Sequence, residues 1–530
     1  MDRGSTLNIA STPNTGSDRR TGRLRRGGPP QNGPATELIE SGFTLENEDA
    51  PFLHHGLNLA DIAHVLDMGR RGLLPAAAER ALLDLLLEVQ RMKPEEFPYD
   101  PAFGEPYNSR ERYFVGKLGD VAGWLHAGRP RREAARIALR LHLRRELAEL
   151  VAEAAAFASE IVAQAQRHGR TLMPDQTYLQ QAQPSTFGHY LLSFAYPALR
   201  DARRLLDELG WVNRSPGGAG CVNGTRLLDD RGFIAAALGF DDVILHTRDA
   251  MWQVDGLIHI LATTASLLSN QSKLAEDLEI WSSSEFDFVD LDDAYTRSSI
   301  LMPQKRNPYS LSIVRGACGV LTGRLTGFLA VVKSPSARSD NLIFAYGEVP
   351  RALDLCRRIT RLMAGVVRTL RVNAERMLEE LLRGYTQATD LAEDLVQRCG
   401  VDYRSAYVVV GNTVREASRR NIPGVEITGD MLDQVALEYT GRSWGLSGAD
   451  LSAVLDPEAI VSSRRVAGGA APAATTAMVE SIAGEIEQVR RLADDRLTAF
   501  DAAEESLLAT AREVAARGRG DSTSENGRDR

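Results

Sequence analysis

The chain has 530 residues, of which 43% are hydrophobic and 25% are charged, and its formal net charge is −9. This length exceeds one ordinary core and predicts several domains, or one long bundle with smaller satellites. The composition is typical of a soluble globular protein, and the acidic balance disfavours non-specific binding to nucleic acid. We therefore expect no nucleic-acid partner.

Nothing in the sequence indicates secretion or membrane insertion. No apolar run approaches the roughly 20 residues that span a bilayer, and the N-terminus carries no apolar signal segment. The four cysteines lie far apart, without the spacing of a zinc site or a disulfide framework: Cys221, Cys318, Cys356 and Cys399. We expect a cytoplasmic protein that has no membrane partner.

The two ends of the chain differ in composition from the rest. Residues 1–35 are rich in Ser, Thr, Gly, Asn, Pro and Arg, and residues 516–530 are equally polar, so both are predicted to be disordered tails. An arginine cluster at residues 19–26 could contact an acidic partner, but a solvated tail fits the composition better.

Between the tails, apolar residues recur at helical spacing over long segments. One such stripe comprises Leu143, Leu147, Leu150, Val151, Ala154, Ala158 and Ile161, and similar stripes occupy residues 257–278 and 353–370. These segments are longer than the usual globular helix of about 11–12 residues. They predict an all-α fold with a central bundle of long helices, and such bundles often bury a second apolar face in an oligomer.

Two loops interrupt the helical pattern. Residues 215–220 (SPGGAG) are rich in glycine but do not fit the spacing of a phosphate-binding or dinucleotide-binding loop. The second loop, from about residue 282 to 308, contains residues 298–308, which read SSILMPQKRNP. We expect the chemistry of the protein to reside in this second loop.

The second loop resembles the signature of the fumarase/aspartase superfamily, G-S-S-x-M-P-x-K-x-N-P. The positions in register are Ser299, Met302, Pro303, Lys305, Asn307 and Pro308. Three further segments resemble argininosuccinate lyase in particular, namely residues 119–131 (GDVAGWLHAGRPR), 177–184 (TYLQQAQP) and 388–392 (ATDLA). The chain thus resembles the argininosuccinate lyase branch of that superfamily from about residue 45 to residue 495.

The resemblance implies a three-domain all-α fold with a tetrameric core. It comprises an N-terminal helical domain (36–128), a central helix bundle (129–375) that carries the signature loop (282–308), and a C-terminal helical domain (376–515). In the family each site is built from segments of three chains, which here are the regions around Arg131, Tyr178 and Ser299. No His/Asp/Glu cluster has metal-ligand spacing, so we predict neither a metal nor a cofactor.

The chemistry of the superfamily explains why such residues are needed. A proton beside a carboxylate is removed, the group on the next carbon leaves, and the product is usually fumarate. The intermediate is a doubly charged aci-carboxylate, and one preorganised donor to it is worth about 3 kcal/mol. The resemblance assigns the base to Ser299 and carboxylate donors to Lys305 and Asn307, and it adds substrate-binding roles for Thr177, Gln183 and Met302.

Some positions depart from the family pattern. Tyr178 stands where the family has a histidine that assists proton transfer, and a tyrosine hydroxyl titrates near 10 rather than near 6.5. The family segment R-S-R-N-D reads Arg129-Pro130-Arg131-Arg132-Glu133, which leaves Arg129, Arg131 and Arg132 as candidates to bind substrate carboxylates. Arg132 is either a bidentate carboxylate ligand or a surface arginine at a helix start.

The amine half of the site departs further. The family holds the guanidino portion of its substrate with a Tyr, a Gln and a Lys, at positions that fall near Ser339, Phe344 and Gly347. The loss of these polar groups predicts an amine other than arginine, with a less polar or smaller group.

These observations predict a carbon–nitrogen lyase that splits an N-substituted aspartate, a small dicarboxylate, into fumarate and an amine. One alternative is argininosuccinate lyase itself. Another is a non-catalytic structural homologue, like the lens crystallins that descend from this family. Retention of Ser299, Lys305 and Asn307 argues against the non-catalytic alternative.

Overall fold

The computed structural model describes residues 33–333, 337 and 342–517, and over these residues the chain is predominantly helical. The prediction of an all-α helix bundle is therefore confirmed. Both predicted tails lie almost wholly outside the described residues, and so does Ser339.

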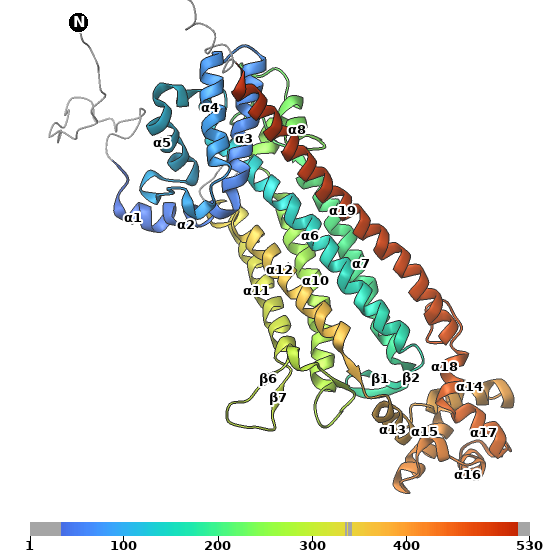
Figure 1. Ribbon diagram of the computed structural model, residues 1–530. Helices are drawn as coiled ribbons and strands as arrows, with labels where there is room; N and C mark the ends of the chain where they lie inside the picture. Colours follow the sequence, from blue (N-terminus) through green and yellow to red (C-terminus); the bar gives the residue numbers. More distant parts are fainter. Residues whose placement is uncertain (1–32, 334–336, 338–341, 518–530) are drawn as a thin grey trace, which may run out of the picture.

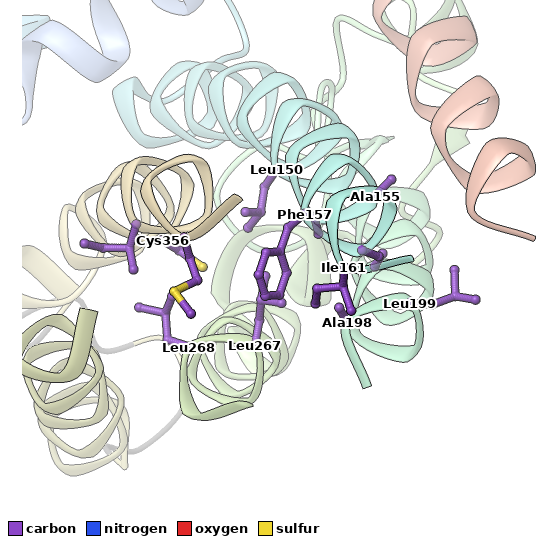
Figure 2. Close-up of a cluster of buried hydrophobic side chains, with 14 of the residues drawn as sticks. Leu150, Ala155, Phe157, Ile161, Ala198, Leu199, Leu267, Leu268 and Cys356 are labelled. Carbon is purple, nitrogen blue, oxygen red and sulfur yellow. The ribbon is translucent and has the colours of Figure 1, made fainter. Parts of the chain in front are cut away.

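Five long helices form the centre of the molecule and run along its length (Figure 1). They are α6 (Arg131–Arg167), α7 (Phe187–Val212), α10 (Asp255–Trp281), α11 (Tyr309–Val332) and α12 (Glu348–Thr369). The predicted stripe from Leu143 to Ile161 is completely buried on α6. Figure 2 shows part of this core, where Phe157 of α6 points toward Leu267 of α10 and lies between Leu150 and Ile161. Burial of one apolar face on each helix holds the bundle together.

Helices at one end of the bundle form a second core, which includes α3 (Ala50–Arg70), α4 (Ala76–Val89) and α5 (Pro106–Leu118). Two short helices, α1 (Thr36–Leu38) and α2 (Thr44–Glu48), precede them in the chain. A π-helical turn (Ile39–Phe43) joins α1 to α2, and a 3-10 helix (Gly119–His126) follows α5. Two further short helices, α8 (Gly232–Ala237) and α9 (Thr247–Trp252), follow α7.

A third core lies at the opposite end of the bundle (Figure 1). It is formed by α14 (Ala388–Cys399), α15 (Tyr403–Arg419), α16 (Gly429–Thr440) and α17 (Gly448–Leu455), with α13 (Ala374–Arg383) and α18 (Pro457–Ser463) on either side in sequence. The last helix, α19 (Pro472–Ala516), then returns along α6 and α7 to the N-terminal core. Because α19 contributes to both the central and the N-terminal core, packing does not follow chain order, and the predicted domain limits stay a prediction.

Strands are few and short. The antiparallel pair β1 (Leu172–Thr177) and β2 (Gln180–Thr186) joins α6 to α7. The other pairs have two residues in each strand: β3 (Arg214–Ser215) with β4 (Asp242–Val243), β5 (Val289–Asp290) with β8 (Arg371–Val372), and β6 (Arg297–Ser298) with β7 (Arg306–Asn307). Among the described residues, no helix is long and apolar enough to cross a membrane.

Close helix contact at Gly56 predicts a measurable stability effect. A Cβ at Gly56 on α3 would lie 2.6 Å from the Cα of Ala138 on α6, so Gly56→Ala should destabilise the protein by about 1–3 kcal/mol. Gly210 on α7 is a matched control, because a Cβ there meets nothing within 4 Å. Gly210→Ala should raise stability by about 0.4–1 kcal/mol. Thermal unfolding that shifts both variants in the same direction would contradict this close contact.

Candidate active site

The signature loop forms a hairpin at the end of α10 and α11 (Figure 1). Its two strands, β6 and β7, pair Arg297 with Asn307 and Ser298 with Arg306. The side-chain amide of Asn307 donates to the carbonyl of Arg297 at 2.9 Å. Arg306 forms ion pairs with Asp290 at 3.2 Å and with Asp293 at 2.8 Å. The base of the hairpin is thus fixed on the bundle, while its tip projects away from it.

Hydrogen bonds near the hairpin tip hold Ser299 and Lys305 opposite each other. The backbone N–H of Ser299 donates to the carbonyl of Lys305 at 3.1 Å, and that of Lys305 donates to the carbonyl of Met302 at 3.0 Å. The backbone N–H of Met302 donates to Ser299 Oγ at 3.0 Å. A donor to Oγ favours the alkoxide over the hydroxyl, as a base requires. Ile300, at the tip, has a fully exposed side chain.

The second candidate segment is the tip of the β1–β2 hairpin. Tyr178 and Leu179 have φ values of 56° and 59°, and the flanking residues Thr177 and Gln180 pair with each other. Two central residues with positive φ make a type I′ turn, which ordinarily uses Asn and Gly. Tyr178 is 99% exposed and Thr177 is exposed beside it, as is Gln183 on β2. The strained turn therefore presents the Tyr178 hydroxyl away from this chain.

The three predicted arginines occupy different environments at the start of α6. Arg129 is buried, where it contacts the carboxylate of Asp61 and donates to the hydroxyl of Tyr107 at 2.9 Å. These are contacts that hold the N-terminal core together. Arg131 is exposed and pairs with Glu105 at 3.0 Å, and Arg132 lines a cavity.

The cavity beside Arg132, here called the α6 cavity, lies where α2, α3 and α5 meet α6 and the start of α12. Its volume is about 70 Å³, and its charged lining consists of Glu46, Asp49, Glu105, Arg132 and Arg136. The sequence analysis missed Glu46, Asp49 and Arg136. A signal existed only for Arg136, which follows Arg132 by four residues and so lies on the same helix face.

Burial raises the pKa of two of the acidic groups that line this cavity. It raises the pKa of Glu46 to about 7, an effect that the nearby Glu105 increases. It also raises the pKa of Asp49 to about 6, although Arg351 pairs with this carboxylate at 2.9 Å and opposes the shift. A Cβ at Gly347 would lie 2.0 Å from Asp49 Oδ1, so the ion pair occupies the space beside Gly347. Phe344 is 51% exposed and does not line the cavity.

The glycine-rich loop at residues 215–220 packs against the start of α6. The carboxylate of Glu133, which is completely buried, accepts the backbone N–H groups of Gly218 at 2.8 Å and Gly220 at 2.7 Å. Burial raises the pKa of Glu133 to about 6 even so. The backbone N–H groups of this loop therefore bind the first turn of α6, which follows Arg129 and contains Arg131 and Arg132, and not a phosphate.

One chain does not bring the three candidate segments together. The 37 residues of α6 extend about 55 Å, at 1.5 Å per residue. Arg131 and Arg132 lie at its first turn, whereas Tyr178 follows its last turn. The β6–β7 hairpin also lies at the end of the bundle that is far from α2 and α5, which help to line the α6 cavity (Figure 1).

Comparisons with known proteins agree with this architecture. A lyase family model matches residues 77–323, and the model of the argininosuccinate lyase C-terminal region matches residues 385–462. The argininosuccinate lyase of Methanoculleus marisnigri is 32% identical over 86% of this chain and 92% of its own length. That of Methanococcoides burtonii is 33% identical over 90% of this chain and 96% of its own length.

Solved structures of lyases are also similar to this chain. EDDS lyase in complex with formate is 27% identical, has a TM-score of 0.81, and covers 91% of this chain and 96% of its own. An EDDS lyase variant with bound fumarate is 26% identical, with a TM-score of 0.80 over the same shares.

The chain belongs to the argininosuccinate lyase branch of the fumarase/aspartase superfamily. It is a carbon–nitrogen lyase that releases fumarate, as predicted. Enzymes of this superfamily act on small dicarboxylates. Within the described ranges, no group of three or more His, Cys, Asp or Glu side chains could hold a metal ion. The prediction that the reaction needs no metal stays a prediction.

Proposed function

We propose that the enzyme splits an N-substituted aspartate by β-elimination, with Ser299 as the base. The Ser299 alkoxide removes the proton from the carbon beside one carboxylate, the electron pair forms the double bond of fumarate, and the amine leaves from the adjacent carbon. The observation that carries the proposal is the hairpin geometry, in which Ser299 Oγ accepts a backbone N–H at 3.0 Å next to Lys305.

Lys305 and Asn307 are the proposed ligands of the carboxylate that gains charge. Lys305 is exposed, and no ion pair of Lys305 occurs within the described part of the chain, so its ammonium is available to substrate. The side-chain amide of Asn307 donates one hydrogen to the backbone carbonyl of Arg297, and its other amide hydrogen remains available to substrate. One such donor contributes about 3 kcal/mol to the transition state.

The remaining roles follow from position. Tyr178, exposed at the hairpin tip, is the proposed proton donor to the leaving nitrogen. Thr177, Gln183 and Met302 are proposed to contact the dicarboxylate. On the arginine side we propose Arg131 and Arg132 as substrate ligands, whereas Arg129 would reach substrate only by leaving its buried contacts with Asp61 and Tyr107.

We further propose a cytoplasmic homotetramer in which three chains complete each site. The span of about 55 Å along α6 supports this arrangement, because Arg131 and Tyr178 of one chain cannot reach one small substrate. The surface of α11 supports it too. Gly316, Gly319 and Gly323 have open space above them, and Val320 beside them is 52% exposed. An uncharged helix face of this kind is suited to contact with another copy.

Two substitutions separate the proposed base from the proposed carboxylate ligand. Ser299→Ala should lower kcat by about a hundredfold or more with little change in KM, because the base acts only on the proton. Lys305→Ala should lower kcat and raise KM, because lysine binds the carboxylate in the ground state as well. Fumarate release, followed by its ultraviolet absorbance, measures both. Ser298→Ala, on β6 of the same hairpin, is the matched control and should leave both constants nearly unchanged. If Ser299→Ala keeps more than about a tenth of the wild-type rate, Ser299 is not the base.

Mixed oligomers test whether sites are shared between chains. Ser299→Ala and Arg131→Ala subunits, each inactive alone, should regain up to about a quarter of wild-type activity after dissociation and random reassembly, because some sites receive two intact segments. Ser299→Ala mixed with Lys305→Ala is the control and should stay inactive, because both lesions lie in one segment. No recovery of activity in the first mixture would place Ser299 and Arg131 of one chain in the same site.

Argininosuccinate should be a poor substrate. The positions near Ser339, Phe344 and Gly347 lack the polar groups with which the family holds the guanidino portion of its substrate. An unpaired buried guanidinium costs on the order of 2–5 kcal/mol, which lowers the rate by roughly thirtyfold or more. A kcat/KM for argininosuccinate near 10⁴ M⁻¹s⁻¹, the low end of ordinary enzymes, would instead identify a genuine argininosuccinate lyase.

A further inference from the structure

Arg136 carries a buried guanidinium that the protein satisfies only in part. The residue lies on α6, one turn after Arg132, and is 9% exposed. Its Nε donates to the carbonyl of Met251 at 3.2 Å, and its guanidinium lies 4.0 Å from the ring centre of Tyr346. Its Nη2 is buried and has no hydrogen-bond partner within the part of the chain that the structure describes. The side chain of Arg136 also lines the α6 cavity.

The other arginines in the same row show what Arg136 lacks. Arg140 and Arg144 follow at four-residue intervals and are also buried. Arg140 donates to the last carbonyls of α7, at Trp211 (3.0 Å) and Val212 (3.1 Å), where the helix dipole is negative. Arg144 donates to the side-chain oxygen of Asn213 at 3.0 Å and to a backbone carbonyl. Among the described residues, every buried guanidinium nitrogen of Arg140 and Arg144 has a hydrogen-bond partner, whereas Nη2 of Arg136 has none.

No carboxylate of the described chain neutralises Arg136. Tyr346 and Glu105 raise its pKa, but Glu105 already pairs with Arg131 at 3.0 Å. Burial and the neighbouring Arg132 lower the pKa of Arg136 as a result. A buried cation without a counter-ion is costly, and the cost is recovered when a bound anion supplies the missing partner.

Glu46 contributes an acidic group to the lining of the same cavity. Among the described residues, this half-buried carboxyl group forms no ion pair, and it does not pair with Arg136 although both line the same cavity. The cavity therefore offers a cationic donor and a separate acidic acceptor. At about 70 Å³ it has room for roughly five water-sized groups, about the size of the polar end of a small amino acid.

We propose that Arg136 binds a carboxylate carried by the amine half of the substrate, with Glu46 accepting a hydrogen bond from its nitrogen. The amine released with fumarate is then a small amino acid rather than a simple alkylamine. This inference rests on the proposed function and adds a specificity-determining residue to it. Arg136 acts on binding of the amine and takes no part in the removal of the proton.

Matched pairs of amines that differ by one carboxylate test the proposal. Glycine against methylamine, and alanine against ethylamine, are compared as ligands of the Ser299→Ala enzyme in the presence of fumarate, by calorimetry. This variant makes binding independent of turnover. The carboxylated member of at least one pair should bind about thirtyfold or more tightly than its partner. Addition to fumarate by wild-type enzyme should show the same preference.

Variants of the arginine row assign the preference to one side chain. Arg136→Gln in the Ser299→Ala enzyme should reduce the ratio within a pair to about one, and Arg136→Lys should restore part of it. Arg140→Gln is the control, since it removes a buried arginine of the same row that does not line the cavity, and should leave the ratio unchanged. A ratio is measured within each variant, so a general loss of stability does not mimic the effect.

Two results would overturn the inference: equal affinity within every pair, or a ratio that Arg136→Gln does not change. Loss of the proposed function gives a different pattern. In that case the carboxylated amines still bind in an Arg136-dependent way, but wild-type enzyme forms no adduct with fumarate.

Discussion

A continuous helix of 37 residues, α6, carries the arginine-rich turn at its start and leads into the Tyr178 hairpin after its end. Its buried leucine and alanine stripe makes it the helix against which α7, α12 and α19 pack. A helix cannot shorten, so the distance between its ends is fixed at about 55 Å. Every other feature of the enzyme has to accommodate this span, including the division of the candidate site into segments that one chain keeps apart.

The same helix also governs how charge is buried. Four arginines at positions 132, 136, 140 and 144 form a row on α6, and the surroundings of the guanidinium group differ from one to the next. Burial and the neighbouring Arg136 lower the pKa of Arg140 to about 10, yet the carbonyl end of α7 supplies Arg140 with two acceptors. Elsewhere Arg110 and Arg129 share the carboxylate of Asp61. Buried cations are stable when carbonyls or carboxylates surround them. Arg132 and Arg136, the first two arginines of the row, line the α6 cavity instead.

Sequence reasoning reached the features that local pattern encodes. The period of the apolar stripe on α6 predicted a buried long helix, and the register of Ser299, Lys305 and Asn307 located the signature hairpin. The β1–β2 hairpin was missed because its turn uses Tyr178 and Leu179, where the usual signal is Asn or Gly. The α6 cavity was missed because Glu46 and Arg136 meet only after the N-terminal helices pack on α6. The return of α19 to the N-terminal core was not visible either, since periodicity gives a helix its apolar face but not its partner.

The positions of these elements separate two tasks. The Ser299 hairpin holds the proposed base and carboxylate donors, which any N-substituted aspartate requires. The α6 cavity, at the other end of the bundle, holds charged groups such as Glu46 and Arg136, which we propose act on the variable amine. Because the two sets lie at opposite ends of the bundle in one chain, a substitution in the cavity changes no packing contact of the hairpin. The amine half can therefore diverge without disturbing the elimination chemistry, which is consistent with a chain that keeps the signature residues and changes the positions around Gly347.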